Sequence, residues 1–341
     1  MFEQRIQNIT SGMDLPGLLV TDPADLFYMT GESLDGFFMF LAKGQAHVFT
    51  SEMLKEQVKA AVPFLNVVAG KDPFESFLSF LKRGKFNSIG IDHSKLKVST
   101  FERFKKNNIK LLDSKGKIEE IRQVKDNKEI EKIRISCKIA SQTYEAVKKL
   151  IKPGVSEIEI SFKIDEIFAR KHVKPSFQTI VAFGDHSAYP HHVCTARKLL
   201  KNDTVLIDMG CIFKGYCSDL TRTHFLGKIT RLNKQVYSLV AEAKKKATQT
   251  LKPAVKAGEV DNAARRIIAS AGFGKYFIHS TGHGVGVEIH ESPRISRKNK
   301  ALIKPGMVIT IEPGIYLPGK FGVRIEDTYL VTETGNEVMT Q

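Results

Sequence analysis

Tryptophan is absent from this chain of 341 residues, and cysteine is scarce, with four residues. No two cysteines form a C-x-x-C pair, so the chain has no disulfide scaffold. None of them stands in a recognisable nucleophile motif. Reduced thiols are expected, as in a cytoplasmic protein, each serving as a small buried apolar residue. These cysteines are Cys137, Cys194, Cys211 and Cys217.

Long apolar runs are also missing. Runs such as 37–42 fall far short of the ~20 residues that are needed to cross a bilayer. The N-terminal segment MFEQRIQNIT has no apolar core followed by small residues, so no secretory signal is expected. We therefore predict a cytoplasmic protein that does not act at a membrane.

The overall composition is that of a globular protein, with 42% hydrophobic and 26% charged residues. It excludes a fibrous or wholly disordered chain, and at ~150 residues per domain the length suggests two domains. The net charge of +15 favours acidic partners, although a solvated lysine-rich surface is the plainer interpretation. Because the lysines are dispersed and no aromatic–basic RNA motif is present, a nucleic-acid partner is not expected.

Two regions with different patterns follow one another along the chain. The first ~120 residues alternate strand-like and helical segments, which predicts an α/β domain. In this region, 37–42 and 46–50 flank Lys43-Gly44-Gln45 and predict a hairpin. Apolar density falls over 113–125, so we predict one domain at 1–120 and a second at 121–341.

The second region predicts helices packed on a largely antiparallel sheet, an α+β domain. Asp126 with Glu129 and Ser156 with Glu159 have the spacing of capping boxes at the starts of two helices. Two more helices are expected at 233–250 and 260–271. The strand-like runs are 204–209, 216–223, 307–311 and 322–331.

Carboxylates and histidines accompany these strands. Asp208 ends one strand, and Asp219 follows across a turn at Gly215, so an antiparallel pair could bring both carboxylates to one point. Aspartates at strand ends also cap turns routinely, so this pair alone is a weak signal. His279, His283 and His290 lie in one glycine-rich segment, a grouping that favours a site over isolated structural histidines.

Two further carboxylates lie near the C-terminus. Glu312 follows an apolar strand and precedes a Pro-Gly turn, and Glu326 lies two residues after Arg324. A plain surface salt bridge is the alternative interpretation of the Arg324–Glu326 pair. Considered together with Asp208, Asp219 and His283, these carboxylates have a charge that two divalent cations would balance. Such an oxygen-rich set with one imidazole suits Mn²⁺, Co²⁺, Fe²⁺ or Zn²⁺, and two ions ~3.5–4 Å apart can activate a shared hydroxide.

These motifs resemble those of the pita-bread metallopeptidases, the family of aminopeptidase P, prolidase, methionine aminopeptidase and the metal-free creatinase. The matching segments are Pro190-His191-His192, Asp208-Met-Gly, Ser218-Asp219-Leu-Thr-Arg-Thr, His279 to Glu291, Glu312-Pro-Gly, and Arg324-Ile-Glu326-Asp327. The resemblance implies a pita-bread catalytic domain at 121–341 and a creatinase-like N-terminal domain at 1–120. Methionine aminopeptidases lack that N-terminal domain.

The resemblance also implies a role for each matching residue. The implied metal ligands are Asp208, Asp219, His283, Glu312 and Glu326, and the set is complete. His191, His290 and Glu312 match catalytic residues, Glu312 as the group that accepts a proton from the attacking water. His279 matches a residue of the substrate pocket, and Arg324 matches an arginine that supports the ligands. Arg294 lies where some prolidase-like members carry an arginine for a free substrate carboxylate, and a solvated surface arginine is the alternative interpretation. His192 has no implied role.

The implied activity is hydrolysis of the Xaa-Pro bond at peptide N-termini, with Mn²⁺ as the expected metal and Co²⁺, Zn²⁺ or Fe²⁺ as alternatives. We predict an Xaa-Pro aminopeptidase, with an Xaa-Pro dipeptidase (prolidase) as the alternative. The expected substrates are small peptides with proline at the second position, and a homodimer is expected. Some relatives with this fold bind protein or nucleic acid instead, but the complete ligand set disfavours that function here.

Overall fold

The computed structural model describes residues 2–114 and 116–340. The chain divides into two units, Met1–Arg122 and Gln123–Gln341. Among the described residues, no helix is both long and apolar enough to cross a membrane.

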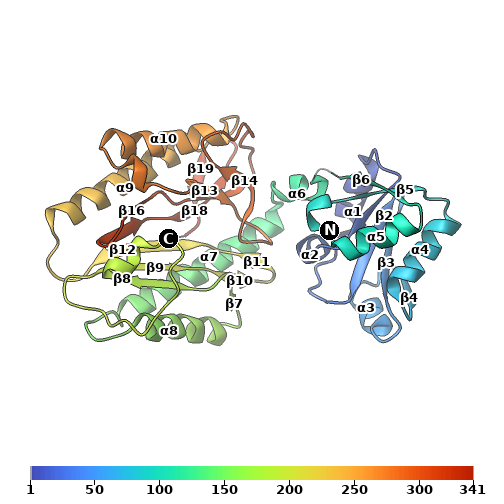
Figure 1. Ribbon diagram of the computed structural model, residues 1–341, viewed down its shortest axis with the longest axis horizontal. Coiled ribbons are helices and arrows are strands. Elements are labelled where there is room, and N and C mark those ends of the chain that lie inside the picture. The colour runs from blue at the N-terminus through green and yellow to red at the C-terminus, as the bar shows by residue number, and fades with distance from the viewer. Residues whose placement is uncertain (1, 115, 341) are drawn as a thin grey trace. The chain divides into compact units, whose positions relative to one another are not determined.

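A mixed sheet with the order β4-β3-β2-β1-β5-β6 forms the centre of the first unit (Figure 1). Its strands are β1 (Gly17–Val20), β2 (Phe37–Ala42), β3 (Gln45–Ser51), β4 (Asn66–Gly70), β5 (Ser88–Ile91) and β6 (Lys110–Asp113). The β2–β3 hairpin is antiparallel, whereas β5 pairs parallel with β1 and β6. The predicted α/β class and the predicted hairpin are both confirmed.

Helices cover both faces of this sheet. They are α1 (Phe2–Ser11), α2 (Pro23–Thr30), α3 (Lys55–Ala61), α4 (Pro73–Arg83), α5 (Val98–Lys106) and α6 (Lys117–Arg122). Because side chains alternate along a strand, Leu18 and Val20 of β1 pack in one core with α1, α2, α3 and α6. Leu19 packs in a second core with α4 and α5. The first unit therefore has its own hydrophobic interior.

The second unit contains small sheets whose described strand pairings are all antiparallel. The sheet orders are β11-β10-β7, β12-β9-β8, β14-β13-β15-β18-β19 and β16-β17. The strands are β7 (Lys174–Pro175), β8 (Ile180–Phe183), β9 (Thr204–Met209), β10 (Cys211–Phe213), β11 (Tyr216–Cys217), β12 (Leu220–Phe225), β13 (Gly282–Gly284), β14 (Glu291–Ile295), β15 (Val308–Ile311), β16 (Gly314–Leu317), β17 (Phe321–Arg324), β18 (Asp327–Val331) and β19 (Asn336–Val338).

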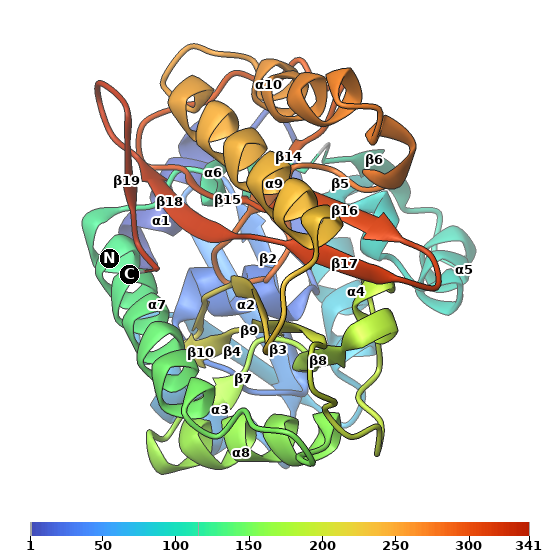
Figure 2. The ribbon, with the colours of Figure 1, turned by 90° about the vertical axis from the view of Figure 1, so that its left-hand side faces the viewer.

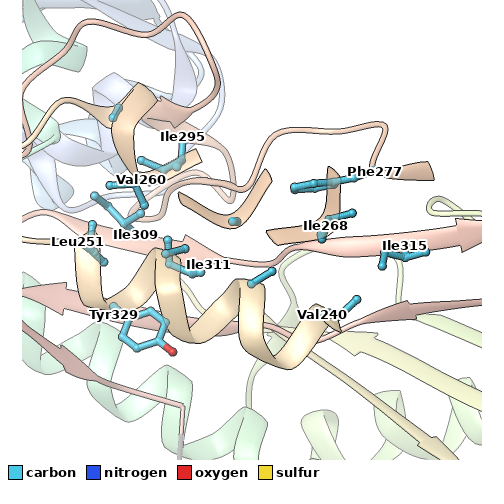
Figure 3. Packing of buried hydrophobic residues seen from close by; sticks show 14 of the residues in the cluster. Val240, Leu251, Val260, Ile268, Phe277, Ile295, Ile309, Ile311, Ile315 and Tyr329 are labelled. Atoms are coloured by element: carbon cyan, nitrogen blue, oxygen red, sulfur yellow. The ribbon is translucent and has the colours of Figure 1, made fainter. Parts of the chain in front are cut away.

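Two pairs of helices enclose these strands. In Figure 2, α9 (Arg231–Thr250) and α10 (Ala257–Ser270) lie on one side, and α7 (Asn127–Lys148) and α8 (Glu157–Arg170) lie on the other. Val240 of α9 and Val260 of α10 belong to one hydrophobic core with Ile309 and Ile311 of β15 (Figure 3). The opposite core joins Val147 of α7 and residues of α8 to β8 and β9. This arrangement confirms the predicted α+β class of the second domain.

Both predicted capping boxes are present. The Asp126 carboxylate accepts hydrogen bonds from the backbone N–H groups of Lys128 and Glu129, both at 2.9 Å, and the Glu129 carboxylate accepts one from the N–H of Asp126. Ser156 and Glu159 form the equivalent box at the start of α8. Each box satisfies backbone N–H groups that the helix itself leaves unpaired.

Two predicted strands are each divided in the structure. The expected strand at 216–223 is interrupted at Ser218 and Asp219, and the expected strand at 322–331 is interrupted at Ile325 and Glu326. The first break occurs because the Ser218 N–H and hydroxyl bond to the backbone of Cys211, which closes the β10–β11 hairpin before β12 pairs with β9. Both breaks place a carboxylate between two strands.

Candidate metal centre

The strands of the second unit bring Asp208 and Asp219 together. Asp208 lies on β9 opposite Thr221 of β12, and Asp219 lies directly before β12. The peptide carbonyl of Asp219 accepts a 2.9 Å hydrogen bond from the hydroxyl of Thr328 on β18. This bond ties the small β9–β12 sheet to the neighbouring five-stranded sheet.

That neighbouring sheet provides the other carboxylates and the imidazole. His283 is on β13, Glu312 follows β15 directly, and Glu326 precedes β18 directly. Gly282 permits the close approach of β13 to β15, because a Cβ atom there would lie 1.8 Å from the carbonyl oxygen of Thr310. The glycine that precedes His283 is therefore required by packing.

The His283 imidazole is oriented toward the carboxylates. Its Nδ1 lies 3.0 Å from the carbonyl oxygen of Gly284 and donates to it, which leaves the lone pair on Nε2. This Nε2 is 3.5 Å from Asp219 Oδ2 and 3.4 Å from Glu312 Oε1. A lone pair directed at two carboxylate oxygens is repulsive unless a cation or a proton lies among them.

The electrostatics of the site indicate the same need for positive charge. Burial, followed by the charges of Asp208 and Glu312, raises the pKa of Asp219 well above its usual range. Burial and the charge of Asp219 likewise raise the pKa of Glu326. Asp208 Oδ1 and Glu326 Oε1 are buried without a hydrogen-bond partner among the described residues.

These observations fit divalent cations. Asp219, His283 and Glu326 each offer one ligand atom within 4.8 Å of the others, and Asp208 and Glu312 lie beside them. A set of carboxylate oxygens with one imidazole matches the preference of divalent first-row metals for oxygen and nitrogen ligands. The unpartnered oxygens of Asp208 and Glu326 have the free lone pairs that coordination requires.

Arg324 lies behind the carboxylates and is only 3% exposed. Its Nη2 donates to Asp208 Oδ2 at 2.5 Å, and its Nε donates to the hydroxyl of Thr221 at 3.1 Å. The same hydroxyl donates to Glu326 Oε2 at 2.6 Å. Arg324 therefore orients Asp208 directly and Glu326 through Thr221, and it is not part of a surface salt bridge.

A hydrogen-bonded chain connects Arg324 to His279. Arg324 Nη1 donates to the phenol oxygen of Tyr316 at 2.8 Å, and the Tyr316 hydroxyl lies 2.9 Å from His279 Nε2. His279 Nδ1 lies 2.7 Å from the carbonyl oxygen of Ser280. Burial, assisted by the charge of Arg324, lowers the pKa of His279 to about 4. His279 is thus neutral near pH 7, and both of its ring nitrogens are already hydrogen-bonded.

All of the predicted site residues lie around one cleft of about 710 Å³. The predicted residues along its wall are His191, Asp208, Asp219, His279, His283, His290, Arg294, Glu312, Arg324 and Glu326. The His290 ring packs edge-on against His283, with 4.4 Å between centroids. Among the described residues, no acidic side chain pairs with the exposed guanidinium of Arg294.

The sequence did not identify every residue of this site. Thr221 lies within the Ser218-Asp219-Leu-Thr-Arg-Thr motif, so its position was available, although its role as a bridge was not. Tyr316 has no local signal, because its partners Arg324 and His279 are brought to it only by folding. Phe177 and Gln178 also line the cleft and belong to no motif.

Comparisons with known proteins give a consistent result over almost the whole chain. Residues 131–333 match metallopeptidase family M24, and residues 4–124 match the creatinase/prolidase N-terminal domain. An Xaa-Pro dipeptidase from Pyrococcus furiosus is 38% identical, covering 99% of this chain and 98% of its own. An Xaa-Pro dipeptidase from Bacillus anthracis has a similar structure, with a TM-score of 0.94, 32% identity, and coverage of 100% of this chain and 97% of its own. An X-Pro aminopeptidase from Thermotoga maritima has a TM-score of 0.88 and 29% identity, covering 96% of each chain.

Proposed function

Because the chain belongs to metallopeptidase family M24, we propose that it hydrolyses Xaa-Pro dipeptides, the reaction for which its dipeptidase relatives are named. These relatives favour the dipeptidase over the aminopeptidase that we expected first. A dipeptide substrate is supported by the position of Arg294, whose exposed guanidinium lies on the wall of the cleft that also contains the candidate metal ligands. Arg294 would bind the free carboxylate of the proline residue.

The proposed metal ligands are Asp208, Asp219, His283, Glu312 and Glu326. Two divalent cations, with Mn²⁺ as the proposed metal, would supply Lewis acidity and an activated water for the hydrolysis. Arg324 would hold Asp208 in place, as its 2.5 Å hydrogen bond to this carboxylate indicates. His283 would use Nε2, because its Nδ1 is bonded to the carbonyl of Gly284.

Three side chains of the cleft would accept the proton of the attacking water and stabilise the negative charge that develops on the substrate carbonyl. Glu312, whose pKa is raised by burial, would accept the proton from the attacking water at its carboxylate. His191 and His290 would donate hydrogen bonds to the carbonyl oxygen as negative charge develops on it. Both imidazoles line the cleft beside the candidate ligands.

A specialised site is needed because an Xaa-Pro bond is a tertiary amide with no N–H to donate. The wall that includes Phe177, Ile180 and His279 offers apolar contact for the pyrrolidine ring. Since both ring nitrogens of His279 are engaged with Tyr316 and Ser280, His279 would contribute its ring and not a hydrogen bond. The substrate amine would lie at the acidic end, beside the carboxylates.

Substitution of Arg294 tests the dipeptide substrate. If Arg294 binds the proline carboxylate, Arg294→Ala should raise KM for Xaa-Pro dipeptides by about 10- to 100-fold, the value of one charge-assisted interaction. Cleavage of Xaa-Pro-Yaa tripeptides, whose proline carboxylate is an amide, should change by less than about threefold. Arg297→Ala is the matched control, because Arg297 is an exposed arginine nearby that does not line the cleft.

The same assay distinguishes the aminopeptidase. An Xaa-Pro aminopeptidase would cleave tripeptides and longer peptides at least as efficiently as dipeptides, and Arg294→Ala would leave both rates unchanged. Failure of the metal-loaded wild-type protein to cleave any Xaa-Pro bond would overturn the proposed function altogether.

A further inference from the structure

His191 lies in a long connection with little secondary structure. The chain leaves β8 at Phe183, forms the short 3₁₀ segment Gly184–Ala188, and reaches β9 only at Thr204. Such a segment does not hold a side chain in place by its own backbone ladder, so the position of His191 depends on how the connection is anchored. Its anchors are on α8 and on Arg324.

The first anchor is the start of α8. The backbone N–H of Glu157 donates to the carbonyl of Arg197, and the N–H of Ile158 donates to that of Thr195, both at 3.1 Å. Free N–H groups of a helix N-terminus are thus satisfied by the connection that contains His191. These two bonds place the Glu157 side chain directly beneath this connection.

The carboxylate of Glu157 is fully buried, with 0% exposure, and is surrounded by donors from the connection. Oε1 is bonded to the backbone N–H of Phe183 at 2.9 Å and to His186 Nδ1 at 2.8 Å. Oε2 is bonded to His192 Nε2 at 2.9 Å, and to the N–H and hydroxyl of Thr195 at 3.0 and 2.7 Å. The donors therefore flank His191 on both sides along the chain.

These bonds use the whole accepting capacity of the carboxylate, which has about four lone-pair sites. Burial alone would raise the pKa of Glu157, but the hydrogen bonds from His192, Phe183 and Thr195 outweigh it, so the pKa is lowered. Glu157, His186 and His192 also have the proximity of a metal site. Because every oxygen lone pair already has a donor, a hydrogen-bonded anchor explains this cluster without an ion.

The second anchor is at the residue before His191. The carbonyl oxygen of Pro190 accepts a 3.3 Å hydrogen bond from Arg324 Nη1, the same guanidinium that holds Asp208. His191 is therefore fixed on one side by Pro190 through Arg324 and on the other by His192 through Glu157. Between these two anchors its imidazole faces the cleft.

We propose that Glu157 is a positioning residue for His191: its buried carboxylate, acting through His192 and Thr195, holds the His191 imidazole against the reacting carbonyl. The inference rests on the proposed function for the role of His191 in hydrolysis. A displacement of about 1 Å in a catalytic group can cost on the order of a hundredfold in rate. In Glu157→Gln, the side-chain NH₂ group would point at groups that are themselves hydrogen-bond donors, such as His192 Nε2 and the Thr195 N–H. This conflict would displace the connection and, with it, His191.

A double-mutant cycle with His191 separates positioning from general loss of stability. Glu157→Gln should lower kcat for Xaa-Pro cleavage by about 10- to 100-fold, with KM changed by less than about threefold. In the His191→Ala background the same substitution should change kcat by less than about twofold. Glu159→Gln is the matched control: the Glu159 carboxylate is hydrogen-bonded to Ser156 in the capping box at the same helix start, and it accepts no hydrogen bond from His186, His192 or Thr195. Any effect of this substitution on kcat should therefore be equal in both backgrounds.

Substitutions of His192 keep the proposal falsifiable if Glu157→Gln folds poorly, and hydrogen exchange adds a test that needs no activity. His192→Gln, which keeps a donor near the position of Nε2, should retain most of the activity, whereas His192→Leu should show the same kcat defect as Glu157→Gln. Amide hydrogen exchange over residues 186–197 should become faster in Glu157→Gln and not in Glu159→Gln, a result that does not depend on any substrate.

Several results would overturn this role for Glu157. An equal loss of kcat with and without His191 would show a purely structural effect. Unchanged exchange over 186–197 would show that the connection does not depend on Glu157. A metal ion lost specifically from Glu157→Gln would identify the cluster as a metal site instead. By contrast, absence of Xaa-Pro cleavage by the wild type would contradict the proposed function, and the exchange experiment would still test the anchor.

Discussion

At the scale of single residues, the carboxylates of the metal centre are destabilising until a cation binds. Asp219 and Glu326 are buried and Glu312 is partly buried, and burial raises the pKa of each. Among the described carboxylates of the centre, Arg324 donates a hydrogen bond only to Asp208, at 2.5 Å. The site therefore retains an excess of negative charge, and stability and metal affinity are coupled through it.

Asp219→Asn tests this coupling. We expect loss of metal binding and a decrease of at least about a hundredfold in kcat/KM, since even residues behind a ligand contribute 10–100-fold. The metal-free variant should nevertheless be more stable than the metal-free wild type by about 1–2 kcal/mol, or roughly 3–6 °C in Tm. Metal analysis and thermal unfolding in chelator measure the two effects.

The pH dependence of this difference follows from the raised pKa of Asp219. Above the unfolded-state pKa of about 3.9, the unfolded chain loses a proton that folded Asp219 retains, so the stability of the metal-free wild type falls as pH rises toward the folded pKa. The advantage of Asp219→Asn should therefore increase with pH over that window. Asp14→Asn, at a side chain that is 99% exposed, is the control and should be neutral. A metal-free Asp219→Asn that is less stable than the wild type at pH 7 would contradict the argument.

The site residues that could be proposed from the sequence are those that lie in short motifs whose residue types are typical of metal binding. Asp208, Asp219, Glu312 and Glu326 became candidates because carboxylates beside apolar strands are costly and point to a shared charge. His283 became a candidate because it lies among other histidines in a glycine-rich segment. Glu157 could not be proposed in this way, because as a glutamate in the first turn of a helix it has an ordinary local explanation. Its hydrogen bonds to His186, His192 and Thr195 exist only after folding.

At the scale of elements, strand periodicity predicted where most strands lie but not where they break. Ser218-Asp219 and Ile325-Glu326 have no glycine or proline to mark an interruption. The breaks arise from competing hydrogen-bond partners. Ser218 is hydrogen-bonded to the backbone of Cys211, and β17 and β18 belong to different sheets. Which strands pair with one another depends on tertiary contacts, so local sequence patterns do not predict these breaks.

The close contact between β13 and β15 gives a prediction at this scale. Gly282→Ala should lower the free energy of unfolding by about 2–4 kcal/mol, because its Cβ would lie 1.8 Å from the Thr310 carbonyl oxygen. Displacement of β13 would also move His283, so metal affinity should fall as well. Denaturant unfolding and metal titration measure the two effects.

Gly335→Ala is the matched control for this substitution. A Cβ at Gly335 meets nothing within 4 Å, so stability and metal affinity should both stay near the wild-type values. If Gly282→Ala were as stable as Gly335→Ala and bound metal equally well, the contact between the two strands would not be what positions His283.

At the scale of the whole molecule, the two units have separate hydrophobic interiors. Leu18, Phe77 and Phe104 belong to cores of the first unit, whereas Val147, Val240 and Ile309 belong to cores of the second. The sequence indicated two regions because the strand and helix alternation of the first gives way to long amphipathic helices in the second. All of the candidate metal ligands lie in the second unit.

Separate cores predict separate thermal transitions, of which only one responds to metal. Phe77 is fully buried and packs against Phe38, Phe40, Phe49 and Phe104. Phe77→Ala should therefore destabilise the first unit by about 3–5 kcal/mol. In calorimetry, this variant should lower the transition of the first unit alone, and chelation of metal should lower that of the second alone. One transition that shifts with both changes would instead mean that the units unfold cooperatively, because metal bound in the second unit would then stabilise Phe77 and its neighbours in the first.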